Sequence, residues 1–212
     1  MVKSIDEKGK DFLYRYIEPE VFEKEYGKPH PDPMIDEFSY GEGYYYSKLI
    51  WNNVNIGSRI FFHTKRCINA MYYINDLAPA SVWRLDKKMK NKYKNPHLHP
   101  EMYPEWWGGD YDLEDKQFDI EVKKAYENGT IYLDTDVLLI GDPEKSADIR
   151  HNPLFLNRDL LLKLDMQGKP VKWNIVDKNG KKLSEERCIS SSLRSPRVIS
   201  KHDGDILEIL VK

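Results

Sequence analysis

The chain has 212 residues, of which 40% are hydrophobic, 12% aromatic and 32% charged. This composition is typical of a folded globular protein with a sizeable core, and it excludes an intrinsically disordered chain. The formal net charge is only −2. Any contact with nucleic acid therefore has to come from a local basic patch rather than from the overall field.

Two cysteines, Cys67 and Cys188, are too few for the disulfide scaffold of a small secreted protein. No apolar run approaches the roughly 20 residues of a membrane span. The first twelve residues lack the apolar stretch of a signal peptide. These features predict a cytoplasmic protein that does not insert into a membrane.

The N-terminal part of the chain predicts a strand followed by a short helix. The strand is expected at Asp11–Ile17, where apolar and aromatic residues dominate. A helix is expected from Pro19 to Tyr26, because proline favours the first helical turn and Gly27 favours the C-terminal cap. The next six residues, KPHPDP, predict an extended loop.

The central part predicts extended chain and a hairpin. We interpret residues 43–51 (GYYYSKLIW) as extended. Two apolar runs at Arg59–His63 and Cys67–Ile74, joined by Thr64, Lys65 and Arg66, predict a hairpin. Residues 84–117 are polar and rich in proline and glycine, and they predict a long insertion or loop, which in compact domains is usually functional or mobile.

The last part predicts further strands and one helix. Strands are expected at Thr130–Leu133, Val137–Ile140, Val171–Val176 and Asp205–Val211, and Gln117–Tyr126 is expected to be a strand running into a helical turn. Asn157 predicts an N-cap for a helix at Arg158–Leu164. Asn179-Gly180 predicts a hairpin turn, since both residues tolerate positive φ. The whole predicts a single α+β domain, residues 1–212, built on a mainly antiparallel, partly closed β-barrel with a few short helices.

Two sets of polar residues suggest metal sites. Glu121 and Lys123, with Asp110, Asp112 or Asp119 upstream, resemble the PD-(D/E)xK arrangement in which carboxylates hold Mg²⁺ beside a lysine. His97 and His99, with His63 or Cys67, could supply zinc ligands. A solvated charged face and ordinary surface histidines are the simpler interpretations. The chain contains no phosphate-binding or dinucleotide motif, so we expect no cofactor.

Aromatic and basic residues are the stronger signal. Rings recur at Tyr44–Tyr46, Trp51, Tyr72, Tyr73, Trp83, Trp106 and Trp107. Exposed rings stack nucleobases, each pair contributing about 1–3 kcal/mol; core packing is the alternative. Lysines cluster at Lys87, Lys88, Lys90, Lys92 and Lys94, and other cations occur at Lys65, Arg66 and Arg194. Local basic zones beside aromatic residues are typical of a nucleic-acid surface.

Two segments resemble the PUA-like group, which includes EVE, YTH-like and modified-nucleotide-associated domains. Residues 56–74 (IGSRIFFHTKRCINAMYYI) are similar to the early strand pair of these domains, with Gly57-Ser58 where Gly-Asp is usual. Residues 136–164, which contain IGDP, are similar to a late strand, turn and short helix. The resemblance implies a small β-barrel that binds RNA or DNA and holds a modified base in an aromatic cage. Some related domains work with a nuclease or methyltransferase partner in restriction systems.

The leading hypothesis is therefore a nucleic-acid-binding module that is not an enzyme and that reads a modified base. Its base-binding rings are expected to be Tyr45, Tyr46, Trp83, Trp106 and Trp107, with Ser47 and Asp142 at the base edge. Its phosphate-binding residues are expected to be Lys48, Lys65, Arg66 and Arg194. The alternatives are a Mg²⁺-dependent nuclease that uses Asp112 or Asp119 with Glu121 and Lys123, and a protein-interaction module anchored by Trp106 and Trp107.

Overall fold

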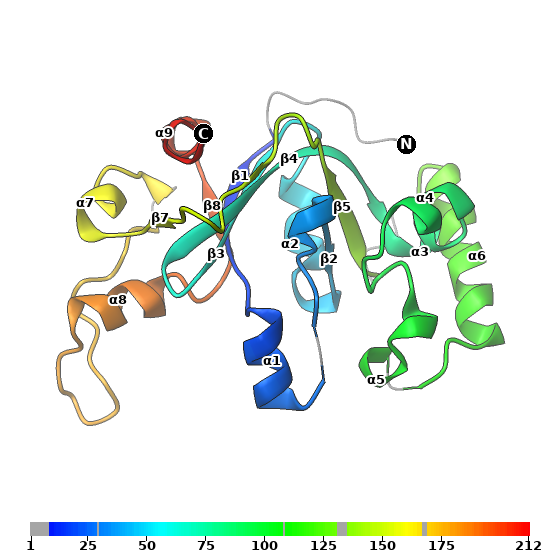
Figure 1. The fold of residues 1–212 in the computed structure, drawn as a ribbon, viewed down its shortest axis with the longest axis horizontal. Helices are drawn as coiled ribbons and strands as arrows, with labels where there is room; N and C mark the ends of the chain where they lie inside the picture. Colours follow the sequence, from blue (N-terminus) through cyan, green and yellow to red (C-terminus); the bar gives the residue numbers. More distant parts are fainter. Residues whose placement is uncertain (1–8, 29, 108, 131–134, 167–168) are drawn as a thin grey trace. The chain divides into compact units, whose positions relative to one another are not determined.

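The computed structural model describes residues 9–28, 30–107, 109–130, 135–166 and 169–212 (Figure 1). The chain divides into two compact units. Among the described residues, unit 1 is made mainly of Glu18–Gly57 and Ile74–Glu144, and unit 2 of Lys10–Ile17, Ser58–Tyr73 and Lys145–Lys212. Candidate site residues from the sequence are found in both units.

Unit 1 combines short helices with a small sheet. Its elements are α1 (Pro19–Tyr26), the 3-10 helix η1 (Ile35–Glu37), β2 (Ser39–Glu42), α2 (Tyr44–Asn53), the end of β4 (Cys67–Pro79), α3 (Ala80–Arg84), α4 (Lys87–Lys92), the 3-10 helix η2 (Pro100–Met102), α5 (Pro104–Trp107), α6 (Leu113–Glu127) and β5 (Val137–Gly141). Figure 1 shows α3, α4 and α6 beside one another, and α3 contacts both of the others. The core of this unit includes Trp83, Tyr93, Leu98, Leu138 and Ile140.

Unit 2 is built on strands covered by helices. Its elements are β1 (Asp11–Arg15), β3 (Arg59–Thr64), the first part of β4, β6 (Ala147–Asp148), β7 (Leu154–Phe155), α7 (Arg158–Leu161), α8 (Glu185–Ser192), β8 (Arg197–Ile199) and α9 (Lys201–Val211). Its core joins Leu13 and Phe61 from the strands to Leu160, Ile189 and Leu207 from the helices.

Strand pairing is mixed. The hydrogen-bonded order is β2-β5-β4-β3-β1-β8, and β6 and β7 also pair with β4. Strands β1 and β3 run parallel, whereas the other pairs are antiparallel. Within the described part of the chain, the end strands β2 and β8 do not pair with each other, so the sheet is not closed into a barrel. The α+β prediction is confirmed.

The elements whose ends are marked by capping or turn residues in the sequence are confirmed. Helix α1 begins at Pro19 and ends at Gly27, which adopts φ 73°. The predicted hairpin is β3 and β4, joined by Lys65 and Arg66, and β1 and β5 also form where expected. Asn157 caps α7 by accepting the Leu160 N–H at 2.9 Å, although the helix is shorter than predicted.

Several expected strands are helices, and those predictions are wrong. Residues 44–53 form α2, because Ser47, Ile50, Trp51 and Val54 are buried at helical spacing. Residues 205–211 belong to α9, in which Leu207 and Val211 are buried four residues apart. The Gln117–Tyr126 segment lies inside α6, which Asp112 starts with a capping box.

Other predictions change in detail. Residues 84–117 are not a loop, since they form short helices and contribute the buried Tyr93 and Leu98 to the core. Val171–Val176 is not a strand: Val176 makes a single bridge to Lys182 across the turn at Gly180. The strand expected at Thr130–Leu133 falls largely outside the described residues. Across the described ranges, we find no helix with the length and apolar character that crossing a membrane requires.

Candidate functional site

The candidate site lies in unit 1 and is centred on His97, in the segment between α4 and η2. The Nδ1 atom of His97 lies 2.9 Å from Asp136 Oδ2, and its Nε2 atom lies 3.8 Å from Asp32 Oδ2. Asp136 directly precedes β5, and Asp32 lies between α1 and η1. An imidazole between two carboxylates is well placed to hold a proton.

Asp32 anchors the cluster from inside and is only 3% exposed. Its carboxylate accepts the Gly41 backbone N–H at 3.0 Å and the Asn95 Nδ2–H at 2.7 Å. The Asn95 Oδ1 atom accepts the His97 backbone N–H at 3.0 Å. One amide side chain thus positions both Asp32 and His97. Gly41 is required here, because a Cβ at this position would collide with the His97 ring.

Burial and mutual charge set the protonation of this cluster. Burial raises the pKa of Asp32 to about 7, although the charge of His97 opposes the shift. Burial alone would lower the pKa of His97, but the charges of Asp136 and Asp32 outweigh it and raise that pKa. Burial alone would raise the pKa of Asp136, but the charge of His97 and its hydrogen bond outweigh burial, so the pKa of Asp136 is lowered. The cluster therefore contains a His97–Asp136 ion pair beside a carboxyl that titrates near neutral pH.

Aromatic rings line a hollow of about 180 Å³ beside this cluster, which we call the small hollow. Its lining residues are His30, Pro96, His97, Trp106, Trp107 and Asp136. The His30 ring meets Trp106 edge-on at 4.3 Å between centroids, and His97 meets Trp107 edge-on at 5.8 Å. Burial, together with the charge of His97, lowers the pKa of His30 to about 4, so this ring is neutral at physiological pH.

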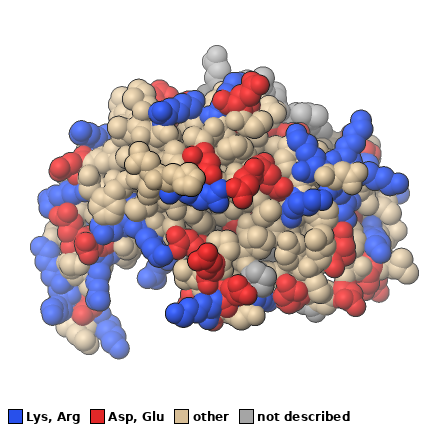
Figure 2. Space-filling model, viewed as in Figure 1, with Lys and Arg blue, Asp and Glu red and all other residues tan. Residues whose placement is uncertain are grey.

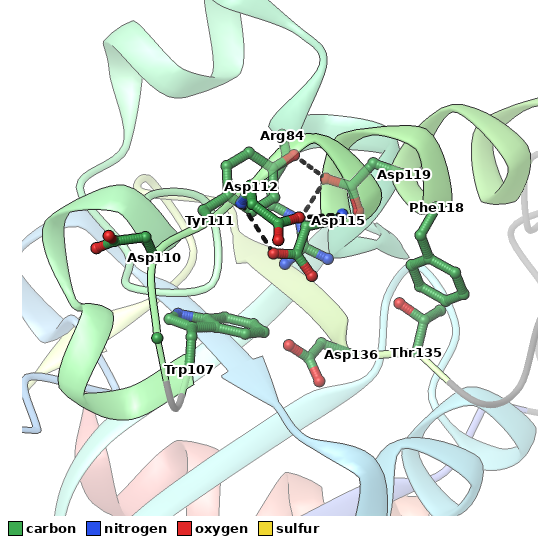
Figure 3. Close-up of a pocket in the computed structure, with 11 residues that line it drawn as sticks. Arg84, Trp107, Asp110, Tyr111, Asp112, Asp115, Phe118, Asp119, Thr135 and Asp136 are labelled. Carbon is green, nitrogen blue, oxygen red and sulfur yellow. Dashed lines mark hydrogen bonds and ion pairs between the residues drawn. The ribbon is translucent and has the colours of Figure 1, made fainter.

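A second hollow of about 680 Å³, the wide hollow, shares Trp107 and Asp136 with the small one. Its other lining residues are Arg84, Gly109, Asp110, Tyr111, Asp112, Asp115, Phe118, Asp119 and Thr135 (Figure 3). Asp119, 1% exposed, pairs with Arg84 Nε at 3.0 Å and accepts the Tyr111 hydroxyl. The Arg84 guanidinium lies 5.1 Å from the centroid of the Trp107 ring. Arg84 thereby links a buried carboxylate to an exposed ring.

This arrangement can bind a planar, hydrogen-bonding ring. The Trp107 side chain is 38% exposed, so its ring remains available to a ligand. Figure 3 shows the Trp107 indole and the Asp136 carboxylate pointing toward the same space. Asp136 uses Oδ2 for His97, and a carboxylate has a second oxygen that can accept further hydrogen bonds. The site thus presents aromatic faces and an acceptor, which is the usual composition of a small-molecule pocket.

Among the expected base-binding rings that the structure describes, two are brought together. Trp106 and Trp107 of α5 both line the small hollow. Trp83 is instead a core residue, 8% exposed, packed in the cluster with Leu98 and Leu138. Tyr46 is 37% exposed on α2 and does not line either hollow. Tyr45 also lies in α2, and its side chain is outside the described part of the structure.

The expected polar and basic contacts are placed elsewhere. Ser47 is 1% exposed on α2, and Asp142 accepts the Glu144 N–H at 3.0 Å in the turn after β5. Neither residue lines the small hollow or the wide hollow, and Lys48 is an exposed residue of α2. The other expected phosphate-binding residues, Lys65, Arg66 and Arg194, belong to unit 2. Arg66 there pairs with Glu186 at 3.0 Å and covers the Phe155 ring.

The alternative metal sites lose their structural basis. Glu121 and Lys123 lie on helix α6 rather than on the strand that an E-x-K motif requires. Glu121 accepts a hydrogen bond from Gln117, and Lys123 faces Glu127 at 3.9 Å. His99 is buried, with its Nε2 atom 2.9 Å from the Tyr93 carbonyl. No group of three or more candidate metal ligands occurs among the residues that the structure describes.

The sequence did not predict several residues that form the site. His30 and Asp32 lie in the proline-rich KPHPDP segment, for which the sequence predicts only an extended loop. Their sequence signal is that each lies between two prolines, which restrict the backbone and hold the polar side chain in place. Asp136, directly before a buried strand, and Arg84, at a helix end, had no sequence signal that distinguished them from other charged residues.

Comparison with known proteins finds no relative of this chain. No family model matches the chain, no curated protein matches it, and no solved structure matches it. The function of this protein therefore has to be inferred from the chemistry of the two hollows.

Proposed function

We propose that this chain is a nucleic-acid-binding protein that holds a single base, including a modified one, in the small hollow. The observation that carries the proposal is the convergence of Trp106 and Trp107 on the Asp136 carboxylate. Rings stack on bases of any sequence, and a carboxylate accepts hydrogen bonds from the base edge. The two features together provide both a platform and an orienting contact.

The size of the small hollow supports a ring-sized ligand. Its volume of about 180 Å³ exceeds the ~150 Å³ that accommodates benzene in an engineered cavity. It is below the ~300 Å³ at which pockets for whole drug-sized ligands begin. A base would therefore enter the small hollow, while its sugar and phosphate would extend out of it.

The lysines of α4 are the phosphate-binding candidates of unit 1. Helix α4 carries Lys87, Lys88, Lys90 and Lys92, and it begins three residues after Arg84, which lines the wide hollow. Figure 2 shows lysine and arginine side chains gathered over α4 at the right of the view. The carboxylates of the wide hollow repel phosphate, so we place the backbone of the nucleic acid toward α4.

The sequence resemblance to PUA-like and EVE-like domains is part of the support for this proposal. It supports base recognition in an aromatic cage and a nuclease or methyltransferase partner. The proposal does not depend on a partly closed barrel, because Trp106, Trp107 and Asp136 form the hollow within unit 1 by itself.

The test is a binding titration with fluorescein-labelled single strands and with duplexes that carry one modified base. We expect Trp107→Ala to weaken binding about 5- to 150-fold, because one stacking contact contributes about 1–3 kcal/mol. The matched control is Tyr46→Ala, an equally exposed ring outside both hollows. Equal effects of the two substitutions, or no binding by the unmodified protein at low salt, would refute the proposal.

A salt series in the same titration identifies the phosphate contacts. For the double variant Lys87→Ala/Lys88→Ala, we expect the slope of log affinity against log salt to fall by about 1–2, since each neutralised phosphate of a single strand contributes about 0.7. Arg194→Ala, in unit 2, tests the contact expected from the sequence. A change in slope with Arg194→Ala alone would move the backbone of the nucleic acid away from α4.

A further inference from the structure

Both tryptophans of the small hollow already attract a cation of the protein. The Lys28 Nζ atom lies 5.0 Å from the centroid of the Trp106 ring, and the Arg84 guanidinium carbon lies 5.1 Å from that of Trp107. Separations within about 6 Å over an indole are favourable cation–π contacts. The faces of these two rings can therefore attract a positive charge as well as stack on a base.

The hydrogen bonds around the hollow leave the Asp136 carboxylate as an acceptor at its polar end. The two ring nitrogens of His97 face Asp136 and Asp32, at 2.9 Å and 3.8 Å. The Arg84 guanidinium faces Asp119 at 3.0 Å and donates to Ser81 at 2.9 Å. A ligand that carries N–H groups can therefore donate them to the carboxylate of Asp136.

Negative charge dominates the wide hollow, which adjoins the small hollow at Trp107 and Asp136. Five aspartates line the wide hollow, namely Asp110, Asp112, Asp115, Asp119 and Asp136. Arg84 is the only lysine or arginine among its described lining residues, and its charge is matched by Asp119. A neutral base would use the stacking surface but not this field, whereas a positively charged ring would use both.

On the basis of the function proposed above, we infer that the small hollow is selective for a positively charged, N-methylated nucleobase of the 7-methylguanine class. Such a base offers a cationic ring to Trp106 and Trp107. Its N1–H and N2–H groups form two adjacent donors that match the carboxylate of Asp136. Unmethylated guanine offers the same donors without the charge, so charge is the feature that distinguishes the two.

The experiment compares 7-methylguanosine 5′-monophosphate with guanosine 5′-monophosphate by isothermal titration calorimetry on the full chain. The two probes share the sugar and phosphate and differ in one methyl group and one charge. We expect the methylated nucleotide to bind about 2- to 30-fold more tightly, which is the fold-change that a cation–π contact supplies. A parallel pair of single strands, with and without one internal 7-methylguanine, shows whether the base is taken from a polymer or as a free nucleotide.

Asp136→Asn tests the source of the selectivity. Asparagine retains an oxygen that can face His97 Nδ1 but removes the charge, so we expect the affinity ratio of the two nucleotides to approach one. The matched control is Asp142→Asn, which lies outside both hollows and should keep the ratio. Equal binding of both nucleotides by the unmodified protein overturns this inference and leaves base binding intact. Absence of binding by both nucleotides and by every oligonucleotide overturns the proposed function as well.

Discussion

Each unit buries a cluster of charged side chains, and the two clusters are satisfied differently. In unit 2, the five N–H donors of the Arg59 side chain are matched by Asp11, Asp205, Glu208 and the Lys201 carbonyl, at 2.6–3.1 Å. In unit 1, the His97 cluster reaches a hollow, and its Asp136 side chain is 16% exposed. A saturated cluster stabilises the fold, whereas one that opens onto aromatic walls can bind a ligand.

The largest expected effect comes from breaking the saturated cluster. Arg59→Ala leaves the buried Asp11 carboxylate without its main partner, so we expect the free energy of unfolding to fall by about 3–5 kcal/mol. Urea denaturation followed by circular dichroism measures the change. The control is Arg158→Ala, whose ion pair with Glu185 is exposed and should contribute less than about 1 kcal/mol. Similar losses for both variants would show that the Arg59 cluster is no more than a surface network.

A second test concerns His63, a buried histidine of unit 2 that belongs to neither cluster. Its ring nitrogens have no hydrogen-bond partner among the described residues, and burial, with the charge of Arg15, lowers its pKa to about 3. The unfolded chain takes up a proton below the ordinary value of 6.5, whereas the folded chain does not. This group therefore removes stability as the pH falls from 6.5 toward 3, by about 2 kcal/mol at pH 5.

His63→Leu should remove this loss of stability at acid pH. It should not destabilise the protein at pH 7, because it deletes buried polar atoms without partners. Thermal denaturation between pH 4 and pH 7 measures the difference. The exposed His202→Gln serves as the control and should keep the pH dependence of the unmodified protein. An unchanged pH profile for His63→Leu would mean that His63 is not buried in the neutral form.

Two glycines distinguish the two clusters most directly. A Cβ at Gly204 would collide with Asp11 and Arg59, and a Cβ at Gly41 would collide with His97. Gly204→Ala should cost about 1–3 kcal/mol of stability, partly offset by the helix propensity of alanine, and should leave ligand binding unchanged. Gly41→Ala should displace the His97 ring and weaken binding of the labelled strands. Loss of binding in Gly204→Ala, with none in Gly41→Ala, would reverse the roles of the two clusters.

Local signals in the sequence were enough for some elements because short-range chemistry decides them. Pro19 and Gly27 set the ends of α1, and two apolar runs around Lys65-Arg66 set the β3–β4 hairpin. The residue types at Trp106 and Trp107 also indicated an aromatic site, since two adjacent tryptophans in a polar segment are difficult to bury together.

Tertiary packing decided the rest. The DILEILV and YYYSKLIW segments have residues that favour strands, yet α9 and α2 form because burial on one side of the chain outweighs intrinsic propensity. The site itself joins Asp32, His97 and Asp136, which are far apart in sequence. Only the folded chain brings these charges to one point, and their pKa shifts arise from burial and proximity, two properties that no local pattern of residues contains.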